Sequence, residues 1–108
     1  MNIYDIWFAR VEIANNIKLR LLKNFESNEI WNFSKNELIE LNLKQSTIEK
    51  ILDIEYRKKL EKYQMYMEKN KIFLFSYKNE YYPTKLKYIS DKPAYIFIRR
   101  ECRYFVWR

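Results

Sequence analysis

The chain contains no glycine in its 108 residues, whereas a typical chain of this length holds roughly seven or eight. Glycine supplies the positive φ angles of tight turns and lets the backbone approach a phosphate closely. A Walker phosphate loop, a dinucleotide-binding fingerprint and a nucleophile elbow all depend on such positions. The sequence therefore excludes all three kinds of site.

Histidine is also absent, and Cys102 is the single cysteine. The chain thus lacks the usual general base, the usual zinc ligand and any Ser-His or Cys-His pair. One thiol forms neither an internal disulfide nor a metal site. We expect no enzyme activity, no cofactor and no metal, and a reducing, cytoplasmic location without a signal peptide or membrane span.

Residues 1–69 show the apolar periodicity of short helices. Apolar side chains recur every three or four positions in two stripes, at residues 3–14 and 17–25. Asn15 and Asn16 interrupt the stripes, since asparagine tolerates a left-handed turn. We therefore predict a helical domain made of several short elements.

Hydroxyl residues mark further helix starts in this half. Ser27 is placed to cap a short helix, and Ser34 and Ser46 each precede a glutamate by three residues, as in a capping box. A long helical pattern runs from Ser46 to about residue 69. We expect Asp53 to divide it into two helices.

The pattern changes after residue 70. Residues 71–77 form a continuous apolar and aromatic run, which indicates a buried strand. Pro83 suits the first position of a short helix, and residues 94–98 predict a second strand. The fold class is therefore mostly α with a small α/β part, with a boundary near Asn70.

Two groups of residues resemble the DprA (Smf) family of DNA-processing proteins over roughly residues 3–98. In the helical half they are Trp7-Phe8, Leu21-Leu22-Lys23-Asn24-Phe25, Ile30-Trp31 and Ser34-Lys35-Asn36-Glu37-Leu38. The more specific group is Tyr63, Met67, Asn70, Ile72, Tyr82-Pro83, Leu86, Ile89, Asp91, Pro93 and Phe97, which falls at the family's spacing.

The resemblance implies a SAM-like or helix-hairpin-helix-like domain at residues 1–69 and the first two strands of a Rossmann-like domain at residues 70–98. In that family the Rossmann-like domain binds single-stranded DNA and helps to load the recombinase RecA in natural transformation. We expect a truncated, non-catalytic fragment of such a protein, without its main DNA site. The alternative is a small helical module that binds another protein and no DNA.

The presumed hairpin departs from the family pattern. Where the family often has Gly-Ile-Gly, this chain has Glu12-Ile13-Ala14. Glu12 repels a phosphate, and Ala14 disfavours the positive φ that brings backbone amides close to it. The sequence therefore argues against DNA binding by this hairpin.

The last ten residues, 99–108, form a basic-aromatic tail. They hold four arginines and no lysine, whereas the preceding 98 residues hold fourteen lysines and three arginines. A one-base slip in a purine-rich codon run can produce such a tail from a family-like continuation. We expect a tail that is frameshift-derived and disordered, or that acts as a degradable end.

The candidate nucleic-acid residues are Lys18, Arg20, Lys23, Arg99, Arg100 and Arg103. The alternative for the first three is an ordinary solvated helix face, and for the last three an accidental composition. Seven tyrosines could stack on bases or lie in the core: Tyr63, Tyr66, Tyr77, Tyr81, Tyr82, Tyr88 and Tyr95.

Two strands without the rest of a sheet leave apolar side chains exposed to solvent. We expect exposure of Ile72, Leu74, Ile96 and Ile98. Their exposure predicts aggregation, self-association through the strand edges, or docking back onto the helices.

Overall fold

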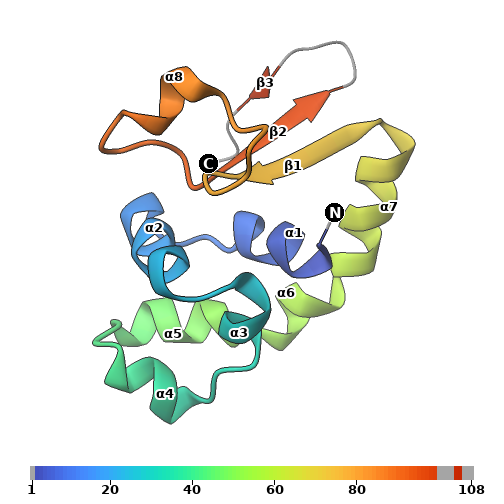
Figure 1. Ribbon diagram of the computed structural model, residues 1–108. Coiled ribbons are helices and arrows are strands. Elements are labelled where there is room, and N and C mark those ends of the chain that lie inside the picture. The colour runs from blue at the N-terminus through green and yellow to red at the C-terminus, as the bar shows by residue number, and fades with distance from the viewer. Residues whose placement is uncertain (1, 100–103, 106–108) are drawn as a thin grey trace.

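The computed structural model describes residues 2–99 and 104–105, which are mostly helical with one small sheet (Figure 1). In chain order the described elements are α1 (Ile3–Arg10), α2 (Asn15–Asn24), α3 (Ser27–Trp31), α4 (Lys35–Glu40), α5 (Gln45–Ile51), α6 (Ile54–Lys58), α7 (Leu60–Lys69), β1 (Ile72–Ser76), α8 (Thr84–Lys87), β2 (Tyr95–Arg99) and β3 (Tyr104–Phe105). In Figure 1, α1 to α6 lie below the sheet and α7 leads up to it.

Two predicted helix starts are confirmed. The Ser34 hydroxyl accepts a hydrogen bond from the Glu37 amide at 3.2 Å, and the Glu37 carboxylate accepts one from the Ser34 amide at 3.1 Å. Asp53 caps α6 by accepting from the Tyr56 amide at 3.2 Å. Both caps depend only on residues close in sequence, which is why the sequence reveals them.

Two other predicted caps are wrong. Glu26 caps α3, so Ser27 is the first residue of that helix and is buried. The helix predicted to start after Ser46 begins at Gln45. The Gln45 side chain donates to the Glu49 carboxylate at 3.2 Å, so this carboxylate does not reach back to complete a box at Ser46.

Within residues 2–99 and 104–105, two non-glycine residues take left-handed backbone angles. Asn42 (φ 61°) follows α4 and Lys71 (φ 55°) follows α7, at the helix ends where glycine is commonest. Asn15 and Asn16, where the sequence predicts such a turn, are instead the first residues of α2. Asparagine reaches this conformation readily, but lysine brings its Cβ close to a carbonyl oxygen, so Lys71 holds backbone strain.

We expect the substitution Lys71→Gly to raise the free energy of unfolding by about 1 kcal/mol. Glycine removes the Cβ contact, and this gain exceeds the extra conformational entropy of the unfolded chain. Urea denaturation followed by circular dichroism measures the change. The control Lys71→Ala removes the charge but keeps the Cβ, so an equal gain from both variants would assign the effect to charge.

The sheet has the order β1-β2-β3, and both pairings are antiparallel. Ile72 lies opposite Arg99 at one end of the β1–β2 pair, and Ser76 lies opposite Tyr95 at the other. Neighbouring strands of a doubly wound βαβ unit run parallel, which differs from the pairing here. The sheet is therefore a small antiparallel element.

The third strand corrects the prediction for part of the tail. Residues 104–105 form β3 and pair with β2 on the side away from β1. Unpaired backbone groups along the open side of β2 can pair with an added strand, and residues 104–105 supply one. The expected disorder is therefore wrong for these two residues, and the rest of residues 100–108 lies outside the described chain.

The core is built around α1, where residues 6–9 are all buried. One face of the sheet packs into the same apolar cluster through Ile72, Leu74, Tyr95 and Phe97. The core thus continues across the boundary predicted near residue 70. The Tyr95 hydroxyl also donates to the Asp5 carboxylate of α1 at 2.8 Å.

The opposite face of the sheet is covered by the segment between β1 and β2. Ile96 points to this face because neighbouring side chains alternate along a strand, and it is fully buried. Figure 1 shows α8 above the sheet, on the side away from the other helices. The exposure predicted for Ile72, Leu74 and Ile96 is therefore wrong, and Ile98 is half-buried. Docking of the strands onto the helices, one of the three predicted outcomes, is confirmed.

Side-chain hydrogen bonds close this covering segment. The Tyr82 hydroxyl donates to the Pro93 carbonyl at 2.6 Å, and burial raises the pKa of Tyr82 to about 12. From α2, the Asn15 amide group donates to the Lys92 carbonyl at 2.7 Å and accepts from the Ala94 amide at 2.9 Å. Tyr82 and Pro93 both belong to the group of residues that resembles the DprA family. Their hydrogen bond thus helps to hold the segment that connects β1 and β2.

Candidate nucleic-acid interface

Lys18 lies inside the protein, with 8% of its surface exposed. Its Nζ donates to the Ala9 carbonyl at 2.8 Å, near the end of α1. Burial lowers the pKa of Lys18 to about 8. Phosphate contact and a solvated helix face both require an exposed ammonium group, so both interpretations are wrong for this residue. The sequence does contain a pattern that predicts this burial, because Lys18 has helical spacing with the apolar residues Leu21 and Leu22.

The other candidates are exposed where they are described. Arg20 and Lys23 lie on the outer side of α2, and Arg20 donates to the Leu41 carbonyl at 3.4 Å. Arg99 is exposed at the end of β2. The predictions for Arg100 and Arg103 lie outside the described residues. Arg99 therefore lies on the sheet, whereas Arg20 and Lys23 lie on α2.

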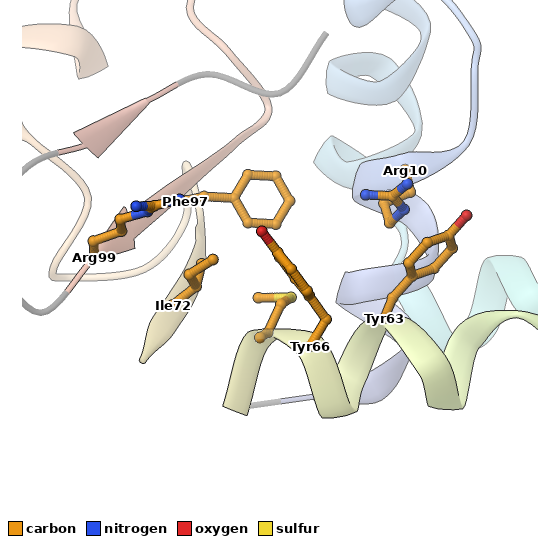
Figure 2. A pocket seen from close by; sticks show the side chains of 7 residues that line it. Arg10, Tyr63, Tyr66, Ile72, Phe97 and Arg99 are labelled. Carbon is orange, nitrogen blue, oxygen red and sulfur yellow. The ribbon is translucent and has the colours of Figure 1, made fainter. Parts of the chain in front are cut away.

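A pocket of about 110 Å³ lies where α7 meets the ends of β1 and β2 (Figure 2). Its walls combine three aromatic rings, two aliphatic side chains and two guanidinium groups, and none of its described lining residues carries a carboxylate. The lining residues are Arg10, Tyr63, Tyr66, Met67, Ile72, Phe97 and Arg99. Figure 2 shows the Tyr66 side chain reaching toward Phe97.

Helix and sheet geometry bring these residues together. Tyr63, Tyr66 and Met67 have the i, i+3, i+4 spacing that places side chains on one face of a helix. Arg99 lies opposite Ile72 in the antiparallel register, and Phe97 shares the same face of the sheet two residues earlier. The end of α1 contributes the second arginine.

The arginine of α1 is held on both sides. The Arg10 guanidinium carbon lies 3.5 Å from the centre of the Tyr63 ring, a cation–π contact. The Tyr56 hydroxyl donates to the Arg10 backbone carbonyl. Burial raises the pKa of Tyr56, and the positive charge of Arg10 partly offsets this rise. The contact with Tyr63 thus orients one positive group of the pocket.

A wider groove of about 1170 Å³ runs beside the loop between α1 and α2. Residues 89–93 form its other wall, so it includes the presumed hairpin. Its charged lining residues are Glu12, Asp91, Arg10, Lys92 and the buried Lys18. Two carboxylates disfavour a DNA phosphate there, which leaves the smaller pocket as the better nucleic-acid candidate.

Sequence reasoning named only part of the pocket. Tyr63 and Tyr66 were among the predicted stacking residues and Arg99 among the cationic ones, but Arg10 and Phe97 were not. The helical spacing on α7 was a usable signal. Arg10 and Phe97 reach the pocket through tertiary packing and strand register, which no local pattern encodes.

Comparisons with protein-family models, curated proteins and solved structures give no significant match to this chain. Among residues 2–99 and 104–105, no helix is both long and apolar enough to cross a membrane.

Proposed function

We propose that this chain is a non-enzymatic protein of the DprA/Smf type that binds single-stranded DNA through the pocket at α7. The observation that carries the proposal is the meeting of Tyr63, Tyr66 and Phe97 with Arg10 and Arg99 in one pocket. Aromatic rings stack on unpaired bases, and guanidinium groups contact phosphates.

The charge of the chain supports the proposal. Its formal net charge is +7, which attracts a polyanion at long range and speeds its association. Tyr66 keeps 54% of its surface exposed although it lines the pocket, so its ring is accessible for stacking. The resemblance to the DprA family extends the proposal to single-stranded DNA as the partner and to a RecA-type recombinase as a second partner.

Fluorescence anisotropy with a labelled single-stranded oligonucleotide tests this function. If Arg10 and Arg99 each neutralise one phosphate, we expect binding by the full chain to weaken about seven-fold between about 50 and 200 mM salt. Absence of binding at the lower salt would overturn the proposal. It would favour the alternative prediction, a module that binds another protein and no DNA.

Arginine variants locate the DNA site. Arg99→Gln should reduce the salt-dependent loss to about threefold, because one phosphate contact fewer releases fewer counterions. Arg20→Gln removes an exposed arginine that does not line the pocket and is the matched control. Equal effects of the two substitutions would show diffuse electrostatic attraction in place of a defined site.

A further inference from the structure

The outer face of α7 carries lysines beside exposed apolar side chains. Lys62 and Lys69 are exposed, Met65 keeps 69% of its surface exposed and Tyr66 keeps 54%. The buried residues of the helix, such as Met67, lie on its other face, toward the core. The outer face therefore offers an aromatic ring and positive charge to a partner in solution.

Helical spacing places Tyr66 between the two lysines. Lys62 precedes Tyr66 by four residues and Lys69 follows it by three, so the three side chains lie on one face of the helix. The two lysine positions are about 10 Å apart along the helix axis. Tyr66 also lines the pocket, where Figure 2 shows its side chain reaching toward Phe97. The outer face of α7 is therefore continuous with the pocket.

The charge of this face is not neutralised. Neither Lys62 nor Lys69 has an aspartate or glutamate three or four residues away, the positions that meet on a helix surface. In the part of the chain that the structure describes, neither lysine forms a salt bridge. Glu61 and Glu68 are each turned by about 100° around the axis from the neighbouring lysine. A negatively charged partner therefore meets two ammonium groups and no carboxylate between them.

From this arrangement we infer that the outer face of α7 holds one nucleotide of a single strand, with its base on Tyr66 and its flanking phosphates at Lys62 and Lys69. The inference rests on the proposed function, because it names two further contact residues for the same strand. Aromatic rings that alternate with positive charges are the pattern by which proteins bind single strands without reading their sequence. An acidic peptide would also attract the lysines, but it presents no base to Tyr66.

Salt dependence tests the lysine contacts with the full chain and a labelled single-stranded oligonucleotide. Each phosphate contact on a single strand adds about 0.7 to the slope of log affinity against log salt. Two lysine contacts multiply each loss expected from the pocket arginines alone by about seven, so the full chain should weaken about fifty-fold between about 50 and 200 mM salt. The double substitution Lys62→Gln with Lys69→Gln should return this loss to about seven-fold.

A matched double variant separates defined contacts from net charge. Lys35→Gln with Lys50→Gln removes two exposed lysines from α4 and α5 and changes the net charge by the same amount. This variant should keep the loss of about fifty-fold. Glutamine has nearly the helix propensity of lysine, so both double variants should keep the circular dichroism spectrum of the unmodified chain.

Variants of Tyr66 test the base contact. Tyr66→Ala should weaken binding at about 50 mM salt by about five-fold or more, the effect of one lost stacked base. The loss between the two salt concentrations should stay the same, because this substitution removes no charge. Tyr66→Phe keeps the ring and should bind as the unmodified chain does.

The outcomes separate the inference from the proposed function. A loss of only about seven-fold for the full chain, or equal effects of the two lysine pairs, overturns the inference and leaves DNA binding by the pocket in place. Unchanged affinity of Tyr66→Ala also overturns the inference. Absence of binding by the full chain at the lower salt overturns the proposed function and the inference with it.

Discussion

Replacement of Trp7 by alanine is expected to lower the free energy of unfolding by about 3–5 kcal/mol. Trp7 is 1% exposed on α1, and its ring centre lies 5.0 Å from that of Trp31 in an edge-to-face arrangement. The Arg57 guanidinium carbon lies 5.0 Å from the Trp7 ring and 4.2 Å from the Trp31 ring. Truncation therefore removes buried apolar surface and one side of a cation–π contact.

The substitution Trp7→Phe is the matched control for this experiment. The buried indole nitrogen of Trp7 has no hydrogen-bond partner among the described residues, so phenylalanine removes a donor that stabilises nothing. We expect less than half of the loss seen with alanine. Urea denaturation followed by circular dichroism measures both variants. A loss below about 1 kcal/mol for Trp7→Ala would contradict a central position of α1 in the core.

Stability should also rise with pH in a window that Lys18 defines. Burial lowers the pKa of Lys18 to about 8 in the folded protein, from 10.5 for the ordinary group. Below the lower pKa both states hold the proton, and the folded state carries the cost of a buried charge. Between the two pKa values the unfolded state binds more protons, so the free energy of unfolding rises by about 2 kcal/mol between about pH 7.5 and 9.5.

Substitution of Lys18 should remove this pH dependence. Lys18→Met keeps the aliphatic length but does not titrate, so its free energy of unfolding should stay nearly flat through the same window. Lys23→Met replaces an exposed lysine of the same helix and should keep the rise. The window ends below pH 10, the ordinary pKa of a group such as Tyr82, because loss of that phenolic proton from the unfolded chain increasingly opposes the effect at higher pH. A parallel rise in the Lys18 variant would contradict the assignment.

Much of the local structure could be predicted from the sequence. Ser34, Asp53 and the apolar runs of β1 and β2 act through neighbours within a few residues, and the structure confirms them. The mostly helical character with one small sheet is confirmed as well. The more specific SAM-like and Rossmann-like domains remain predictions, carried by the resemblance to the DprA family.

Non-local features could not be predicted in the same way. The antiparallel register that sets Arg99 beside Ile72 depends on the path of the whole segment between the strands. Arg10 reaches the pocket because α1 packs against α7, and only the folded chain brings these helices together. The candidate site could therefore be named only in part, through Tyr63, Tyr66 and Arg99.

The way β3 joins the sheet bears on how this end of the chain can change in evolution. Main-chain hydrogen bonds to β2 set the place of Tyr104 and Phe105, and such bonds are blind to side-chain identity except for proline. Proline at either position would remove a main-chain donor, so it is the substitution that this pairing is least able to accept. The pairing itself places no requirement on the other residue types at these two positions.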